Sequence, residues 1–267
     1  MYPSVIFPGN YYAKENTQRW LDGGFTFSEL LNANTKRHGK KMFIGGHLTY
    51  QEPSYSNEFE EIPHGIVRQI IKKKDGLTLK AEQYRRKSHD IWKIVANEHA
   101  SGLPDQAKYK QDTWEWTVRR EFFDHFMDRA TYLLDLAVSQ ENMKGEKLPS
   151  LAEAIAWIEI ARINDEMVSK SASVWKNLGL GYMSIVRNKE NSIPGMVDIF
   201  KGSENSFLAD SLKDVWWDRV GDVNEWKSWS TRRWSDTWGS FLKIDKAKED
   251  PSYRNVKSIY DSVMSQK

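Results

Sequence analysis

The chain has 267 residues, no cysteine, and 39 basic against 37 acidic side chains, so its formal net charge is only +2. The missing cysteines exclude a disulfide scaffold, a thiolate zinc site and a cysteine nucleophile, and the balanced charge gives no support for nucleic acid as a partner. The length fits one large domain or two modest ones. No stretch approaches the roughly 18 consecutive apolar residues of a transmembrane helix, and the start lacks a signal-peptide pattern, so we expect the chain as given to be soluble.

The first predicted helix follows a capping box. Thr26 and Glu29 have the spacing in which a hydroxyl accepts a free helix amide and a glutamate reaches back to the cap. The helix is expected to run to Arg37 and His38, whose positive charge suits a helix C-terminus, and to stop at Gly39.

Strand-like stretches follow this helix. Lys41–Ile44 is expected to form a buried strand closed by Gly45 and Gly46, and the β-branched stretch Gly65–Ile71 a second one. The Asp75-Gly76 pair marks a turn, after which Leu77–Leu79 is a candidate hairpin partner. A helix followed by strands indicates a small, partial α/β segment over residues 1–80.

The remainder, residues 81–267, is predicted to be a helical domain with a repeat-like array. From about residue 88 onward, apolar residues recur at intervals of three and four. These stripes are Phe122, Phe126, Ala130, Leu133 and Ala137; Leu151, Ile155, Ile158 and Ala161; Trp234, Trp238 and Phe241; and Val256, Ile259, Tyr260 and Val263. Such segments favour stacked antiparallel helices, with the Asn188–Asn205 stretch as a long loop or broken helix. The fold class is therefore α+β, mostly α.

One motif in this region is specific. Trp175, Leu178, Gly179 and Tyr182 fit the tetratricopeptide opening W-x2-L-G-x2-Y at every fixed position. The glycine allows two helices to approach, and the two aromatic rings fill the space between them. Asn191 stands where a small residue is expected further on. The interpretation is a tetratricopeptide-like array with degenerate repeats, and an irregular helical bundle is the alternative.

Residues with catalytic potential are sparse. The six histidines form no H-x-x-x-H or H-E-x-x-H pair, so no metal ligands are assigned. The sequence Asn97-Glu98-His99 is the nearest acid–base cluster, although such neighbours are common on solvated surfaces. Gly45-Gly46-His47 resembles the start of an oxyanion loop, but no G-x-S-x-G elbow follows it.

Tryptophans and basic runs offer binding alternatives. Core packing is the favoured interpretation for most tryptophans, although neighbours such as Trp216 and Trp217 point about 100° apart on one helix, so both cannot be buried. The runs Lys72-Lys73-Lys74 and Arg85-Arg86-Lys87 are either solvated ends of elements or contacts to anionic lipid headgroups.

Several segments resemble one enzyme family. The positions that carry the resemblance are Pro8, Gly9 and Asn10 within Val5–Asn10, then Trp92, Asn97 and Glu98 within Trp92–Glu98, together with the Phe27–Gly46 run and the Trp175–Tyr182 region. In these segments and in their order along the chain, the sequence is similar to the C-terminal, lumen-facing part of a eukaryotic multi-spanning O-mannosyltransferase. That family modifies the immunoglobulin-like plexin-transcription-factor (IPT) domains of plexins and related receptors.

The resemblance implies a role for this chain within a larger enzyme. The full enzyme would transfer mannose from dolichyl-phosphate mannose to serine or threonine hydroxyls in the endoplasmic reticulum. Its catalytic acid is expected on a loop between early transmembrane helices, so no catalytic residue and no cofactor is assigned to this chain. The implied partners are folded IPT-type acceptor domains and the membrane part of the same enzyme.

Three hypotheses follow for the function. The first is a luminal, non-catalytic domain of an O-mannosyltransferase that positions folded acceptor domains. The second is a stand-alone tetratricopeptide-like scaffold that binds peptides or proteins, since helical repeats build extended concave surfaces. The third is a free-standing enzyme built around Asn97, Glu98 and His99.

Overall fold

The computed structural model describes residues 5–13, 23–38, 41–45, 52–73, 80–96, 102–139, 148–187 and 223–265. The chain divides into two compact units, Met1–Thr78 and Leu79–Lys267. The first contains short strands and helices, and the described part of the second contains helices and the loops that connect them. The predicted fold class, mostly α with a small α/β part, is confirmed.

The first unit begins with two short strands and a capped helix. Strands β1 (Tyr11–Tyr12) and β2 (Gly24–Phe25) pair in parallel. Helix α1 (Phe27–His38) follows directly. The Thr26 amide donates to Glu29 Oε2 at 2.7 Å, and the Glu29 amide donates to Thr26 Oγ1 at 3.3 Å. The capping box and the expected helix are therefore both confirmed.

A three-stranded antiparallel sheet completes the first unit, in the order β3-β5-β4. Strand β3 is Met42–Gly45, β4 is Phe59–His64 and β5 is Val67–Lys72, with helix α2 (Pro53–Glu58) before β4. The predicted strand is confirmed, but it is buried on one face only, because β3 is an edge strand in which Ile44 is buried and Phe43 is 46% exposed.

The sheet corrects the expected start of β5. Gly65 and Ile66 form the turn between β4 and β5 rather than part of a strand, and Gly65 has a φ of 65°, which a glycine adopts without strain. The expected hairpin turn at Asp75-Gly76 and its partner Leu77–Leu79 lie outside the described residues.

The core of the first unit lies between the sheet and its two helices. It joins one buried leucine of α1, one tyrosine of α2 and one residue from each strand. These residues are Leu31, Tyr55, Ile44, Phe59 and Ile70. Met42 lies opposite Ile70 in the sheet and Ile44 is two residues further along β3, so Ile44 and Ile70 share the face against which α1 and α2 pack.

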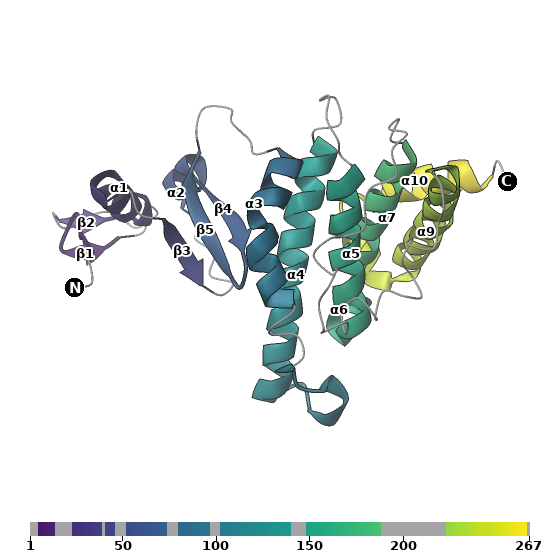
Figure 1. The fold of residues 1–267 in the computed structure, drawn as a ribbon, viewed down its shortest axis with the longest axis horizontal. Helices are drawn as coiled ribbons and strands as arrows, with labels where there is room; N and C mark the ends of the chain where they lie inside the picture. Colours follow the sequence, from purple (N-terminus) through teal and green to yellow (C-terminus); the bar gives the residue numbers. More distant parts are fainter. Residues whose placement is uncertain are drawn as a thin grey trace. The chain divides into compact units, whose positions relative to one another are not determined.

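The longer helices of the second unit lie side by side in chain order (Figure 1). Their bounds are α3 Ala81–Ile94, α4 Trp114–Ser139, α5 Leu148–Asn164, α6 Glu166–Lys170, α7 Ala172–Arg187, α9 Val223–Lys243 and α10 Tyr253–Met264, with short 3-10 helices η3 (Gln106–Lys108) and η6 (Asp245–Glu249). The helical region starts at residue 81 and not near residue 88. The sequence pattern did not show this first part of the helix, because Glu82 and the cations that follow it interrupt the apolar pattern.

Neighbouring helices run antiparallel, as expected. Near the start of α4, Arg119 contacts Asn164 at the end of α5, whereas Arg129 contacts Glu153 near the start of α5. The predicted stripes on α4 and α5 and the Trp234–Phe241 stripe on α9 are buried. In the last stripe Val256 is buried, while Ile259, Tyr260 and Val263 are partly exposed.

Helix α5 is the centre of the array. Every residue from Ser150 to Ala161 is buried, so α5 is covered on all sides. A helix buried all round belongs to the middle of a packed domain. In the described part of the chain, no helix is both long and apolar enough to cross a membrane.

Candidate functional site

The P-G-N segment joins the two short parallel strands. The Asn10 amide donates to the Gly23 carbonyl oxygen at 2.5 Å, directly before β1 and β2 begin. A Cβ on Gly9 would lie against the backbone of Gly23, and a Cβ on Gly23 would lie 2.9 Å from Asn10 Nδ2. Gly23 also has a φ of 100°. This close backbone approach gives Gly9 and Asn10 a structural role in this unit.

The residues just before this segment are bound to helix α1. The Ile6 amide donates to Asn34 Oδ1 at 3.0 Å, and Asn34 Nδ2 donates to the Ile6 carbonyl oxygen at 2.9 Å. One asparagine side chain thereby pairs with both backbone groups of Ile6, as a neighbouring strand would. This segment is fixed at both ends, while Pro8 itself is exposed.

Trp92 is a core residue of the helical unit. It is fully buried on α3, and its ring lies 5.6 Å from the ring of Trp157 and 6.1 Å from that of Phe126. The guanidinium carbon of Arg129 lies 5.4 Å from its centroid. The Trp92 position of the motif therefore serves packing between α3, α4 and α5. Asn97, Glu98 and the adjacent His99 lie outside the described residues.

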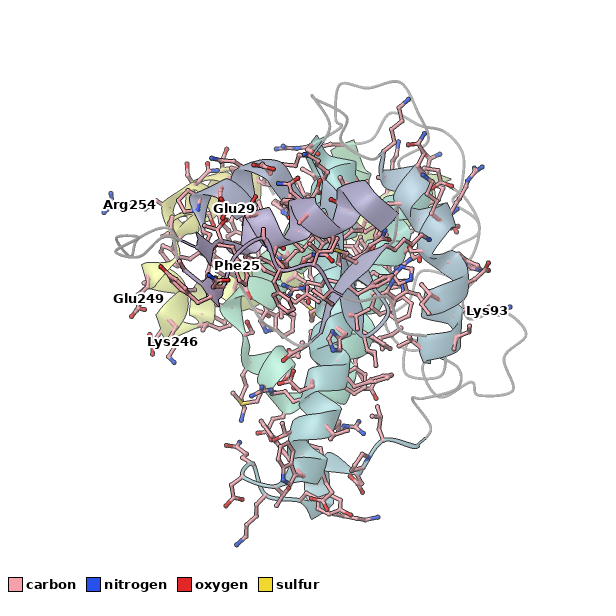
Figure 2. All side chains as sticks on the ribbon, turned by 90° about the vertical axis from the view of Figure 1, so that its left-hand side faces the viewer. Phe25, Glu29, Lys93, Lys246, Glu249 and Arg254 are labelled. Atoms are coloured by element: carbon pink, nitrogen blue, oxygen red, sulfur yellow. The ribbon has the colours of Figure 1, made fainter. Side chains whose placement is uncertain are left out.

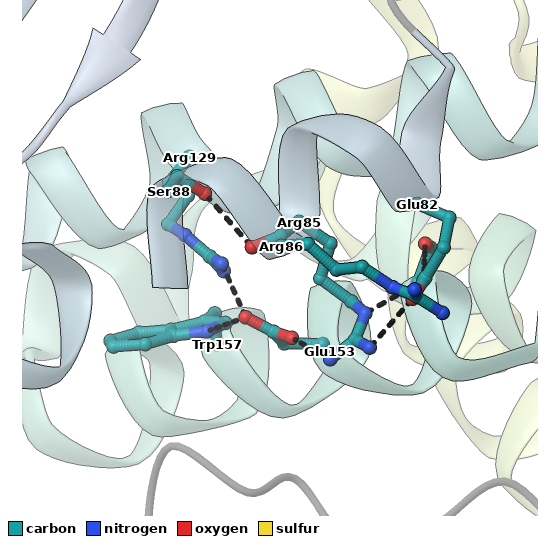
Figure 3. Close-up of polar contacts among 8 residues, drawn as sticks. Glu82, Arg85, Arg86, Ser88, Arg129, Glu153 and Trp157 are labelled. Atoms are coloured by element: carbon teal, nitrogen blue, oxygen red, sulfur yellow. Dashed lines mark hydrogen bonds and ion pairs between the residues drawn. The ribbon is translucent and has the colours of Figure 1, made fainter. Parts of the chain in front are cut away.

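Charged side chains form a first buried network between these three helices (Figure 3). Glu153 of α5 accepts from Arg129 of α4 and, at 3.2 Å, from Arg85 of α3. Arg85 also donates to Glu82 at 2.7 Å and 2.8 Å. Arg129 is fully buried, and its guanidinium carbon lies 5.4 Å from the ring centroid of Trp92 and 5.1 Å from that of Trp157. These two cation–π contacts offset part of the cost of burying the charge.

Glu82 of the first network is held in its ionised form. Burial alone would raise the pKa of Glu82, but hydrogen bonds from Arg85 and Arg86 outweigh burial and lower it. The Glu153 side chain is almost completely buried and contacts two guanidinium groups. Because its pKa is lowered, Glu82 is a poor general acid or base near neutral pH.

A second buried network lies on the other side of α5. Glu159 accepts from Tyr182 of α7 at 2.8 Å, from Arg162 at 2.7 Å and from Arg233 of α9 at 2.5 Å. Burial raises the pKa of Tyr182 well above the usual range for tyrosine, and the Glu159 carboxylate adds to this rise. Tyr182 is therefore neutral at physiological pH and acts as a hydrogen-bond donor.

The tetratricopeptide-like opening lies on α7 and is used for helix packing. Leu178 and Tyr182 are fully buried, and a Cβ on Gly179 would overlap the indole ring of Trp238 from α9. Trp175 donates from Nε1 to the Ser169 carbonyl oxygen at 2.8 Å, and Arg162 lies over its ring at 5.0 Å. All four motif residues thus join α7 to the helices around it, and the glycine gives α9 room to approach.

The basic runs are partly structural. Arg85 points inward to the first network, and Arg86 pairs with Glu82 at 2.7 Å while 70% exposed. In the first unit, Lys72 lies 3.8 Å from Glu58, and Lys73 donates to the Ser56 carbonyl oxygen at 2.6 Å. Lys74, Gly46 and His47 lie outside the described residues.

Most tryptophans of the described helices are in the core, as expected. Trp92 and Trp157 are fully buried, and Trp116, Trp234 and Trp238 nearly so, whereas Trp114 is 81% exposed at the start of α4. Trp216 and Trp217 lie outside the described residues. In the described ranges, no group of three histidine or carboxylate side chains is placed to hold a metal ion.

Comparison with known proteins identifies one relative. No protein-family model matches the chain, and no solved structure matches it. A curated protein does. It is the protein O-mannosyl-transferase tmem260 of Dictyostelium discoideum, 26% identical over 198 residues. The match covers 72% of this chain and 22% of that protein, so this chain corresponds to about a fifth of its relative. The expected similarity to an O-mannosyltransferase is confirmed at this level.

The buried networks are the feature that sequence patterns missed. Arg129 and Glu153 are 24 residues apart, and Glu159 and Arg233 are 74 apart, so no local spacing connects them. The usable signal is the pair of glutamates at 153 and 159 inside the otherwise apolar stretch 151–161. On a helix that is buried on every face, each carboxylate requires a cation as its partner.

Proposed function

We propose that this chain is a luminal, non-catalytic domain of a protein O-mannosyltransferase, in the endoplasmic reticulum. The observation that carries the proposal is the 26% identity to a protein O-mannosyl-transferase over 72% of the chain. The donor, dolichyl-phosphate mannose, and the catalytic acid belong in this proposal to the membrane part of the enzyme. The domain itself contributes recognition of the acceptor protein.

The geometry of the helical unit supports a recognition role. Its buried carboxylates, Glu153 and Glu159, are each paired with two arginines and are closed to solvent. What these networks provide is a row of helices in fixed register, and stacked helices present extended surfaces on which a folded partner can lie. The proposed partners are folded acceptor domains of the IPT type, which the resemblance to the O-mannosyltransferase family implies.

The test is transfer of mannose by the full enzyme to two acceptors that share the same modification site. One acceptor is a folded IPT domain, and the other is an unfolded peptide that contains the same modified serine or threonine. Enzyme from which this domain has been removed should lose transfer to the folded domain and keep transfer to the peptide. Equal transfer to both acceptors with and without the domain would contradict an acceptor-positioning role.

A second candidate is a scaffold that binds extended peptides and has no link to glycosylation. The observation in its favour is the W-x2-L-G-x2-Y opening at Trp175–Tyr182, which packs α7 against α9 as a helical repeat does. Binding of unfolded peptides to the isolated chain, without any binding of folded acceptor domains, distinguishes this candidate from the first.

A further inference from the structure

The first helix of the array has an unusual concentration of positive charge. Residues 80–94 contain five lysines and arginines and two carboxylates, so this segment alone carries +3, while the entire chain carries +2. Arg85 is directed into the buried network, and the other four cations are Lys80, Arg86, Lys87 and Lys93. All four are exposed.

The outer face of α3 is defined by what its inner face buries. Ala81, Tyr84, Ser88 and Trp92 are the buried residues of the helix. At 100° per residue, Lys80 and Lys87 line one flank of the opposite face, and Arg86 and Lys93 line the other. The cations extend over about 20 Å of helix, at 1.5 Å per residue. Figure 2 shows Lys93 pointing away from the helices.

These lysines have no partner among the described residues. Arg86 pairs with Glu82, whereas Lys80, Lys87 and Lys93 make no ion pair or hydrogen bond in the part of the chain that the structure describes. Asp90 is the one carboxylate exposed on this outer face. Between the two flanks, Ile94 is 43% exposed at the end of the helix.

We propose that this outer face of α3, formed by Lys80, Arg86, Lys87, Lys93 and Ile94, docks on anionic lipid headgroups. The argument is charge complementarity over an extended, straight face. Lysines act as flexible point charges, which suits a fluid surface of phosphates, whereas a fixed acidic protein site favours the planar fork of arginine. The only exposed arginine of this face is already engaged with Glu82.

The exposed isoleucine fits the same partner. A helix that lies on a membrane places lysines and arginines toward the headgroups and an apolar side chain into their boundary with the acyl chains. Each lysine near an anionic surface contributes about 1 kcal/mol of binding, so three lysines together change the partition coefficient by about 100-fold. This inference does not depend on the proposed role in mannose transfer, because it concerns a different surface property and needs no enzyme activity.

The test is co-sedimentation of the full chain with vesicles of phosphatidylcholine alone or of phosphatidylcholine mixed with phosphatidylserine. Binding is expected only to the mixed vesicles, and it should weaken at high ionic strength, where charges are screened. The triple variant Lys80→Gln, Lys87→Gln, Lys93→Gln should lose about 100-fold in partition coefficient, while Asp90→Asn should gain about 5-fold.

A matched control carries the same change in charge elsewhere in the unit. Lys243, Lys246 and Lys248 are exposed at the end of α9 and in η6, and their triple change to glutamine should leave vesicle binding within about 5-fold of the parent. Equal losses in both triple variants would overturn the proposal, as would the absence of binding to the mixed vesicles. Binding of the chain to polyglutamate in place of vesicles would show that the partner is an acidic protein, and would also overturn it.

Discussion

At the residue scale, the most informative side chain is Glu153. Its carboxylate joins Arg129, which is completely buried, to Arg85 on a different helix. A buried ion pair adds little to stability compared with a well-packed apolar pair, but loss of one member leaves the other charge uncompensated. The importance of Glu153 therefore lies in what its removal exposes.

We expect Glu153→Gln to lower the free energy of unfolding by about 3–5 kcal/mol, because Arg129 then remains charged in a dry environment. The measurement is urea denaturation followed by far-ultraviolet circular dichroism. The control is Glu166→Gln, whose partner Lys170 is 64% exposed and whose effect should stay below about 1 kcal/mol. Equal small effects for both variants would mean that the Arg129 charge is neutralised in another way.

Gly179 is the second residue whose importance comes from a single contact, here between α7 and α9. Gly179→Ala places a methyl group where the indole of Trp238 lies, so α7 and α9 must separate or the ring must move. We expect a loss of about 1–3 kcal/mol in the free energy of unfolding. Gly102→Ala is the control, because a Cβ there meets no atom within 4 Å. A tolerated Gly179→Ala would show that the interface between α7 and α9 is loosely packed.

At the element scale, sequence patterns located helices better than strands. The stripe from Phe122 to Ala137 predicted α4 because its burial follows one helix face. Strand β4 was missed, because Glu60, Glu61 and Pro63 are unfavourable in a strand. The position of β4 in the sheet explains how these residues are tolerated. The strand lies at an edge, where a proline removes no interior hydrogen bond of the sheet.

Motifs whose residues lie close together in the sequence were predicted correctly. The capping box at Thr26 and Glu29 was predicted because both partners are three residues apart. The tetratricopeptide-like opening was found for the same reason, since its four residues lie within two turns of α7. By contrast, the contacts of Trp175 with Arg162 and of Gly179 with Trp238 depend on which helices become neighbours.

The turn before α10 provides a pH-dependent contact. Asp250 lies 2.6 Å from Lys176 of α7, and it accepts from the Ser252 amide at 2.8 Å. Slight burial opposes ionisation, but the hydrogen bonds from Lys176 and Ser252 are stronger and lower the pKa of Asp250 to about 2. Because the folded pKa lies below the unfolded value of 3.8, this contact stabilises the fold above about pH 4 and is lost as the pH falls toward 2.

We therefore expect Asp250→Asn to be less stable than the parent at pH 6, by no more than about 1 kcal/mol because the pair is partly exposed. The difference should shrink between about pH 4 and pH 2, as the parent is protonated. The measurement is urea denaturation of both proteins across this range. Asp245→Asn is the control, since Asp245 is 96% exposed, and its difference from the parent should stay small at every pH. A constant difference for Asp250→Asn would assign its effect to geometry rather than charge.

At the scale of the whole molecule, both buried networks lie inside the helical unit. The first joins α3, α4 and α5, and the second joins α5, α7 and α9, so α5 takes part in both. The large buried aromatic side chains Trp92, Trp157 and Tyr182 belong to the same unit. Residues 79–267 thus contain their own core and the partners of both buried glutamates.

We expect residues 79–267, produced alone, to fold cooperatively, because a core of this size meets the requirements of an independent domain. The measurement is urea denaturation followed by circular dichroism and by tryptophan fluorescence, which should give coincident transitions. In the fragment, Glu153→Gln should cost the same free energy as in the full chain, since all partners of Glu153 are retained. A fragment that is helical but unfolds without a cooperative transition would mean that residues 1–78 are needed to order the array. In that case Glu153→Gln should lower the free energy of unfolding less in the fragment than in the full chain, because the array around Glu153 would be ordered only in the full chain.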